Sequence, residues 1–490
     1  MMKGSKFLLL LFHFSLQIIN LQAQFSGSNL LESQYGRLPS DTNSIATVYD
    51  RAVLNYSYKK IKTGLTLEQF HSKNNGSSYI KPDQFSLQYS SDRFELKAGN
   101  FYETIGRGLL LRSYEIQGAI IEDLSYRSRH YFHRDILGLS SKLKLKNFNL
   151  GLISGRTLNN VFPPTFSKDD RRVDMITAVY SDYSFNKQTV KASVLQLKNT
   201  GSTSYYGMLS VSGILLPFLS YYTELAKNVS DFRIMDFSGK SSYAFYSGLN
   251  LIFANLGLSA EYKNYKNFLI GTGINEPPSL VKEHTYKVLN RSTHVLQPLN
   301  ETGYQLEIFY NFPDLSKLTL NNTIAVNDFN KKFVFQEYFA GYDFQAGGNH
   351  DTKLFADFAR DPFKGEENRL SAGLAVELVL RESSNIIKTG YEFQTFTRYD
   401  EPVQNHVISA GYLFKSKFAF ILTTELSNDP FLTDEKFIVW PGTDIRYQIN
   451  NKNTVQLCAG RRRGGPACNA GICYEVLDFY GIELRLKSRF

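Results

Sequence analysis

Apolar and polar residues alternate along most of this chain, and the end of the sequence shows the pattern clearly. In GIELRLKSRF (481–490), Ile482, Leu484 and Phe490 fall on one face of an extended chain, and Glu483 and Arg485 fall on the other. A period of two residues predicts a β-strand with one apolar face. An edge strand of a soluble protein would show the same pattern, so the rest of the chain has to separate the two interpretations.

The same alternation recurs from about residue 50 to the end, and helical periodicity is not evident anywhere. Examples are RAVLNYSYK (51–59), GLTLEQFH (64–71), QFSLQYSS (84–91), YQLEIFYNF (304–312) and LSAGLAVELVL (370–380). Roughly two dozen runs approach the 9–11 residues of a tilted transmembrane strand, with polar turns between them. The pattern predicts an all-β fold, a single large antiparallel transmembrane β-barrel of roughly 20–24 strands. A soluble β-sandwich array or propeller would alternate in a similar way.

The N-terminal residues favour the membrane barrel. Lys3 and Lys6 precede the apolar run 7–12, and Ala23 supplies a small residue for cleavage. This arrangement predicts a secretory signal peptide over residues 1–23 and an exported chain from Gln24. No later apolar stretch approaches 18 residues, and no Pro/Ser-rich linker divides the chain. We therefore expect one outer-membrane barrel domain over residues 24–490.

Composition refines the expected partners. Aromatic residues make up 14% of the chain, with 38 Phe and 31 Tyr but one Trp, Trp440. Abundant Tyr and Phe suit the aromatic girdles of outer-membrane barrels. A net charge of +9 is mild for 490 residues, so no nucleic-acid partner is expected. The expected partners are outer-membrane lipid and lipopolysaccharide, the barrel assembly machinery, and an envelope protein.

Two long segments interrupt the strand pattern and are the candidate functional regions. The first runs from Gly99 to about Arg134 and begins GNFYETIGRGLLLRSYE; the second runs from about Asn264 to Gly303. Long connections that are not low-complexity are usually functional. The first segment concentrates charge at Glu103, Arg107, Arg112 and Glu115. We expect the part from Gly99 to Glu115 to fold inward and, with the block around Asn290 and Arg291, to narrow or plug the lumen. Arg112 would pair with Glu103 or Glu115; a solvated surface hairpin is the alternative.

Signatures of catalysis are scarce, and we expect no enzyme activity, cofactor or metal. His130 and His133 lack a third ligand, so they do not indicate a metal site. His350-Asp351 could form part of a hydrolase dyad at a barrel rim, which is the enzymatic alternative.

Three cysteines lie near the end of the chain. Cys468 and Cys473 are separated by four residues, and in an exported protein such a loop can close as a disulfide; free thiols are the alternative. Cys458 would then remain unpaired. Because the strand ending at Phe490 should run toward the periplasm, we expect this hairpin to lie outside the cell.

Three blocks resemble an uncharacterised family of large exported β-barrel proteins from Bacteroidetes-type bacteria, a domain of unknown function. They are GNFYETIGRGLLLRSYE (99–115), NEPPSLVKEHTYKVLNRSTHVLQPLNETGYQLE (275–307) and GRRRGGPACNAGICYEVLDFYGIELRLKSRF (460–490). The resemblance implies an outer-membrane location and fold but no known activity. It marks Asn100, Tyr102, Glu103, Gly108, Arg112, Glu115, Pro277, Pro278, Asn290, Arg291, His294, Glu301, Gly464, Gly465, Cys468, Cys473, Glu483 and Phe490.

The final strand also resembles the C-terminal signature by which assembly machinery recognises outer-membrane barrels, with Phe490 as the signal residue. The lumen candidates are Asn100, Tyr102, Glu103, Arg107, Arg112, Glu115, Asn290, Arg291 and His294. The leading hypothesis is a non-enzymatic outer-membrane barrel for solute passage or docking of an envelope component. The alternatives are a barrel-rim hydrolase acting on lipid or peptide, and a structural partner of a secretion or assembly machine.

Overall fold

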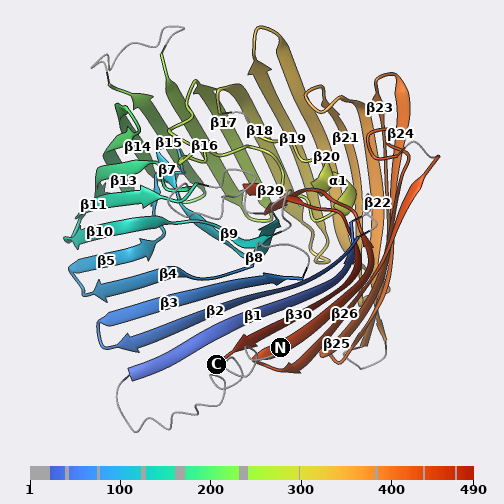
Figure 1. Ribbon diagram of the computed structural model, residues 1–490. Helices are drawn as coiled ribbons and strands as arrows, with labels where there is room; N and C mark the ends of the chain where they lie inside the picture. The colour runs from blue at the N-terminus through green and yellow to red at the C-terminus, as the bar shows by residue number, and fades with distance from the viewer. Residues whose placement is uncertain are drawn as a thin grey trace, which may run out of the picture.

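The strands of this chain close on themselves. The computed structural model describes residues 23–38, 43–73, 78–122, 128–159, 171–230, 241–296, 298–380, 385–433, 436–469 and 472–490, so the predicted signal peptide lies almost entirely outside them. Neighbouring wall strands pair antiparallel, and β30 pairs with β1, which gives a closed barrel of 24 strands (Figure 1). The all-β barrel prediction is confirmed, at the upper end of the expected strand number.

The wall strands are β1 (Ala23–Arg37), β2 (Ser44–Tyr58), β3 (Ile61–Ser72), β4 (Tyr79–Ser90), β5 (Phe94–Phe101), β10 (Ile136–Lys144), β11 (Phe148–Thr157), β12 (Met175–Phe185), β13 (Gln188–Asn199), β14 (Ser202–Leu216), β15 (Leu219–Asn228), β16 (Tyr243–Phe253), β17 (Leu256–Lys266), β18 (Asn300–Asn311), β19 (Lys317–Asp328), β20 (Lys332–Ala346), β21 (His350–Asp361), β22 (Glu366–Leu380), β23 (Asn385–Arg398), β24 (Glu401–Phe414), β25 (Phe418–Ser427), β26 (Ile438–Asn450), β27 (Asn453–Arg462) and β30 (Phe479–Arg489).

The two mouths of the barrel differ. At the mouth where β1 begins and β30 ends, here the terminal mouth, strands are joined by two to five residues. Some of these turns have left-handed residues, such as Asn186 (φ 43°) and Lys187 (φ 63°), as hairpin turns that follow the strand twist require. At the opposite mouth, here the insert mouth, connections include residues 102–135, 267–299 and 463–478. We call these the first, second and third inserts.

The outer face is apolar and carries two groups of exposed aromatic side chains. Aliphatic residues such as Leu65, Leu152 and Leu374 are exposed between them. This order is typical of a membrane-facing barrel wall with an aromatic girdle at each interface. Toward the terminal mouth the aromatic group includes Tyr56, Tyr89, Phe94, Phe148, Tyr183, Phe253, Tyr310, Phe414, Tyr447 and Phe490; toward the insert mouth it includes Tyr205, Tyr262, Tyr304, Tyr338, Phe358 and Tyr391.

All three inserts fold into the space enclosed by the wall (Figure 1). The first contains β6 (Thr104–Ile105), β7 (Leu111–Arg112), β8 (Tyr114–Glu122) and β9 (Arg129–Arg134); the second contains α1 (Lys287–Arg291); the third contains β28 (Gly465–Asn469) and β29 (Ile472–Val476). No helix within the described ranges is long and apolar enough to cross a membrane.

The inserts occupy the half of the barrel nearest the insert mouth. On β13, the inward residues Ser193, Leu195 and Leu197 are buried, whereas Lys191, closer to the terminal mouth, is only half-buried. Inward residues of β3 and β19 follow the same gradient. The lumen is therefore filled by protein on one side and forms a vestibule on the other.

Candidate functional site

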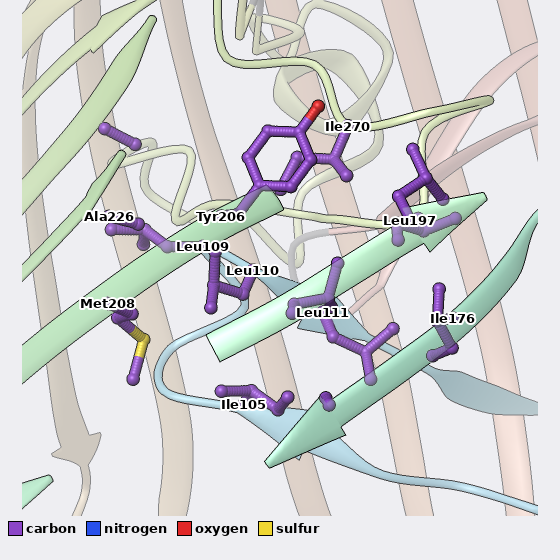
Figure 2. Packing of buried hydrophobic residues seen from close by; sticks show 14 of the residues in the cluster. Ile105, Leu109, Leu110, Leu111, Ile176, Leu197, Tyr206, Met208, Ala226 and Ile270 are labelled. Atoms are coloured by element: carbon purple, nitrogen blue, oxygen red, sulfur yellow. The ribbon is translucent and has the colours of Figure 1, made fainter. Parts of the chain in front are cut away.

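A hydrophobic core joins the first insert to the barrel wall. Leu109, Leu110 and Leu111 are almost completely buried. They belong to a cluster with inward side chains of the wall, including Ile176, Leu197, Met208 and Ala226 (Figure 2). Lumen-facing positions of outer-membrane barrels are ordinarily polar, so an apolar inner wall needs a cover. The three leucines provide that cover, and the predicted inward fold of this segment is confirmed.

The second insert completes the same core. Phe268, Ile270 and Ile274 are buried in it. Two backbone hydrogen bonds join the inserts: Arg112 N–H donates to the Ile274 carbonyl at 3.1 Å, and Glu276 N–H donates to the Gly108 carbonyl at 3.0 Å. Gly108 has φ 92°, and a Cβ there would lie 2.5 Å from the Glu276 carbonyl oxygen. Glycine is therefore required for this close approach.

The charged residues of the first insert pair with the wall. Glu103 lies 2.7 Å from Lys97 of β5, and Glu115 lies 3.3 Å from Arg51 of β2. The carboxylates expected to pair with Arg112 are therefore bound to cations of the wall, which corrects that expectation. The reason is that β5, which leads directly into the insert, and the more distant β2 present lysine and arginine inward at the height of the insert.

Arg107, Asn100 and Tyr102 also contact the wall. The Arg107 N–H donates to Glu224 of β15 at 2.9 Å, and its guanidinium carbon lies 4.8 Å from the centre of the Tyr222 ring. Asn100 Nδ2 donates to Asp135 at 2.8 Å, and Gln84 Nε2 donates to the Tyr102 hydroxyl at 2.8 Å. Burial near Glu115 and Asp135 raises the pKa of Tyr102, so the phenol stays neutral.

Arg291 fixes the second insert to two other parts of the chain. Its Nε and Nη2 donate to Glu425 of β25 at 2.9 and 3.1 Å. Nη1 and Nη2 donate to the carbonyls of Gly464 and Arg463 in the third insert, at 2.8 and 3.2 Å. The preceding Asn290 lies in α1 and its Nδ2 contacts the His284 carbonyl at 3.5 Å. One guanidinium thus connects the wall, the second insert and the third insert.

His294 fixes the end of the same insert. Its Nδ1 lies 3.0 Å from Asp361 of β21, its Nε2 lies 3.6 Å from Glu301 of β18, and its ring stacks on Phe335. Burial alone would lower the pKa of His294, but hydrogen bonds and charges from Asp361 and Glu301 outweigh burial and raise the pKa.

A pH dependence of the second insert follows. A group whose pKa is higher in the folded state contributes its full stabilisation below the unfolded histidine pKa of about 6.5, and loses it as pH rises through the folded pKa. We expect protease cleavage within residues 267–299 to increase with pH over this window, and the increase to disappear in His294→Gln. Burial and Lys81 lower the pKa of His130 in the first insert to about 2, so cleavage of the first insert should not change over the same pH range. Equal changes in the cleavage of both inserts would contradict the role given to His294.

The third insert was not predicted to lie in the lumen. The hairpin of β28 and β29, expected to lie outside the cell, instead contacts α1 and β8. Its Tyr474 ring lies 5.2 Å from the Phe132 ring of the first insert, beside a buried cluster that includes Tyr114 and Ile121. The correction has a physical reason: Phe132 and its neighbours form an apolar surface inside the barrel, and the hairpin covers it.

The backbone register of this hairpin places Cys468 directly opposite Cys473. Opposite residues in an antiparallel pair have Cα atoms about 4.5–5.5 Å apart, a separation that a disulfide spans. We expect a disulfide that stabilises the fold by about 2 kcal/mol, because the closed loop is short. Mass spectrometry of non-reduced peptides measures this directly, and alkylation of both residues before reduction would contradict it. Cys458 is a free cysteine on β27.

The first insert is also joined to the seam between β1 and β30. Arg129 of β9 lies 2.7 Å from Glu32 of β1 and 3.8 Å from Glu483 of β30. Glu122 lies 3.3 Å from Arg129, and Arg485 contacts both seam glutamates. The Arg129–Glu32 contact has ion-pair distance without hydrogen-bond geometry. The seam therefore contains two buried carboxylates, Glu32 and Glu483, and the Arg129 guanidinium of the first insert lies close to both.

Phe490 closes the same seam at the terminal mouth. Its N–H donates to the Gly27 carbonyl at 3.0 Å, and its carbonyl accepts from the Gly27 N–H at 2.9 Å. The ring is 45% exposed and stacks on Phe25. An exposed aromatic end suits the predicted recognition by assembly machinery, which remains a prediction.

The residues considered for catalysis or metal binding have other contacts. His350 Nδ1 accepts from the Val379 N–H at 3.2 Å, and the Asp351 carboxylate accepts from Gln345 at 3.4 Å. Neighbours on one strand point to opposite faces, so these two do not form a dyad. His133 lies 3.6 Å from Asp135, and His130 stacks on Tyr79. In the described part of the chain, no group of three or more His, Cys, Asp or Glu residues could hold a metal ion.

Comparison with solved structures finds a similar fold in one complex and weaker matches to two further structures. An E. coli P pilus tip assembly intermediate, PapC-PapD-PapK-PapG, matches with TM-score 0.53 and 12% identity over 95% of this chain; the chain spans 60% of that chain's length. The P pilus usher (PapC) translocation pore matches with TM-score 0.48 and 12% identity, over 95% of this chain and 99% of that chain. The outer membrane protein opdK from Pseudomonas aeruginosa matches with TM-score 0.35 and 10% identity, over 80% and 99%.

Fold and lumen together define a class: a 24-stranded β-barrel filled on one side by its own inserts. A family described as "Family of unknown function (DUF6029)" matches residues 5–118 and 220–369, which is more than half of the chain. The chain belongs to this family. The matched ranges include residues 102–118 of the first insert and the whole of the second insert. No curated protein sequence matches the chain.

Proposed function

We propose that the protein is a non-enzymatic outer-membrane β-barrel whose three inserts close the lumen to passive diffusion. The observation that carries this proposal is the way the inserts are held. The first two inserts share a buried apolar core with the wall, the third packs against the first, and ion pairs at Arg129 and Arg291 bind the first and second inserts to the wall. Loops that only surround the mouth of a pore do not need buried contacts with the wall, because their charged side chains remain exposed to solvent.

The orientation follows from loop length. Outer-membrane barrels have short periplasmic turns and longer extracellular loops. The terminal mouth, with its short turns, would face the periplasm, and the inserts would enter from the cell surface. The apolar outer wall and its two aromatic groups support contact with outer-membrane lipid and lipopolysaccharide, and Phe490 is the proposed contact for the assembly machinery. Solute passage would then require an insert to move.

Conductance in planar bilayers tests the closure. Phe101 and Ile136 are paired at the ends of β5 and β10, so a short Gly-Asn-Gly turn can replace residues 102–135. We expect the parent protein to show little or no steady conductance and the shortened protein to form large open channels. Leu110→Asp is a milder variant that places a carboxylate in the apolar core and should give intermittent opening. A parent protein with a large, stable conductance would refute the proposal.

A further inference from the structure

A polar groove lies between the first insert and the wall. It has a volume of about 540 Å³, which lies within the range of about 300–1,000 Å³ that is usual for ligand-binding pockets. Its floor is formed by β2, β3, β4 and β5, and its inner end by Tyr102 and Glu115 of the first insert. Many of the lining side chains are hydroxyls, amides or cations, such as Ser57, Asn55, Gln88 and Lys62.

The groove is long and has a cation at each end. Strand register places Ser57 beside Lys62, Lys62 beside Gln88, and Gln88 beside Lys97, so these residues form a row near the terminal mouth. Arg51 lies six residues from Ser57 along β2, and at 3.3 Å per residue the two are about 20 Å apart. The lining therefore fits an extended molecule better than a compact one.

The inner end is held in place by buried groups. Gln84 Nε2 donates to Asp135 at 2.7 Å as well as to Tyr102, and Asn100 donates to the same carboxylate. Arg51 lies 3.7 Å over the centre of the Tyr131 ring, and its Nη2 donates to Gln84 and Glu115. These contacts fix the amide and guanidinium before any ligand arrives, which lowers the entropic cost of binding.

Donors for an anion remain at both ends. Lys97 already has Glu95 and Glu103 as partners, at 3.3 and 2.7 Å. Within the described residues, Lys62 pairs with no carboxylate, and Arg51 Nη1 donates no hydrogen bond. An unpaired positive charge is thus available at the outer end from Lys62, whereas Arg51 at the inner end is paired with Glu115 but keeps Nη1 as a free donor.

We propose that this groove binds a short, linear, acidic oligosaccharide. Serine and threonine hydroxyls and asparagine and glutamine amides each donate and accept hydrogen bonds, as sugar hydroxyls do. The free donors of Lys62 and Arg51 would hold the carboxylates of acidic sugar units. The lining also includes Val53, Phe85, Leu87 and Phe101, and a sugar ring, which carries hydroxyl groups around an apolar face, matches both kinds of surface. The vestibule position makes the site reachable from the terminal mouth.

Calorimetric titration of the folded, detergent-purified protein tests the proposal, with tri-galacturonate as the probe. We expect saturable binding, and a roughly tenfold weaker affinity in Lys62→Gln, because one charge-assisted hydrogen bond is lost. Lys353→Gln on β21 is the matched control, because Lys353 is an exposed lysine outside the groove. This variant should bind tri-galacturonate with the affinity of the parent protein. Asn55→Trp should block the groove sterically and abolish binding.

Two comparison ligands test whether the groove prefers an acidic oligosaccharide to a neutral sugar or an acidic peptide. The neutral trisaccharide maltotriose should bind at least tenfold more weakly than tri-galacturonate, and tri-glutamate should also bind more weakly. Absence of tri-galacturonate binding, binding unchanged in Lys62→Gln and Asn55→Trp, or stronger binding of tri-glutamate would each overturn the proposal. Because binding is measured without a membrane, it can fail while the closure proposed above still holds, and the reverse is also true.

Discussion

Replacing Arg291 with methionine is expected to release the second and third inserts while the barrel wall stays folded. Methionine keeps the apolar length of the side chain but removes the ion pair with Glu425 and the hydrogen bonds to Arg463 and Gly464. Glu425 is 6% exposed, so it would be left as a buried charge without its bidentate partner, with Lys287 at 3.7 Å and Arg463 as the remaining nearby cations. Breaking one partner of a buried pair costs about 3–5 kcal/mol.

Three measurements follow the release. Trp440 is the only tryptophan in the chain, and the Arg463 guanidinium carbon lies 5.0 Å from its ring centre, so its fluorescence reports on the third insert. We expect altered emission, new protease cleavage within residues 267–299 and 463–478, and a higher conductance. Arg360→Met is the matched control, because its pair with Glu367 is exposed and should contribute at most about 1 kcal/mol. Parent-like fluorescence, cleavage and conductance in Arg291→Met would show that this side chain does not hold the inserts.

Replacing Arg129 with methionine is expected to weaken the closing seam of the barrel. Glu32 and Glu483 are buried on the first and last wall strands, and Arg129 lies between them. Without its charge, the cluster of Glu32, Glu122 and Glu483 loses a buried cation that lies 2.7–3.8 Å from all three carboxylates, while Arg462 and Arg485 remain. Removing one partner from a buried ion-pair cluster costs about 3 kcal/mol.

Heat modifiability measures the seam, since a closed barrel resists detergent until all its strand pairs separate. The Arg129→Met protein should convert from the folded to the unfolded gel band at a lower temperature than the parent. Adding Glu32→Gln to this variant should restore part of the loss, because it removes the excess negative charge. Conversion at the parent temperature in Arg129→Met, or further loss in the double variant, would rule out this account of the seam.

The wall of the barrel could be predicted from the sequence because each strand carries its own alternation of apolar and polar residues. Ile482 and Leu484 are exposed on the outer face and Glu483 is buried inside, as the alternation at the end of the chain indicates. Each strand carries this signal independently, so an error in one strand does not affect the others. The long segment that begins at Gly99 could also be recognised, since it breaks the period of two.

The contacts inside the lumen could not be predicted in the same way. Arg51 and Lys97, the partners of Glu115 and Glu103, lie on wall strands, and nothing near Arg112 in sequence indicates that its neighbouring carboxylates are already bound. The closed ring decides which inward side chains meet an insert, and a one-dimensional pattern does not contain that geometry.

Two signals in the sequence did point to the missed features. The third insert interrupts the alternation with Gly464, Gly465 and Pro466, but its shortness suggested an ordinary hairpin. Small apolar residues such as Ala226 and Ala244 occupy lumen-facing positions of β15 and β16, where an open channel would carry polar side chains. Such positions indicate a wall that another segment covers.

The place of the third insert in the chain has a consequence for biosynthesis. Phe132 of the first insert is covered by Tyr474, which is separated from it by most of the polypeptide, and Glu32 of the first strand contacts Arg485 of the last. The interior therefore remains incomplete until the final segments arrive. A chain interrupted after β26 would keep Phe132 uncovered and Glu32 without Arg485, and so would present apolar surface and buried charge to the proteases that remove unfinished proteins. The packing of the lumen thus distinguishes a full-length product from a truncated one.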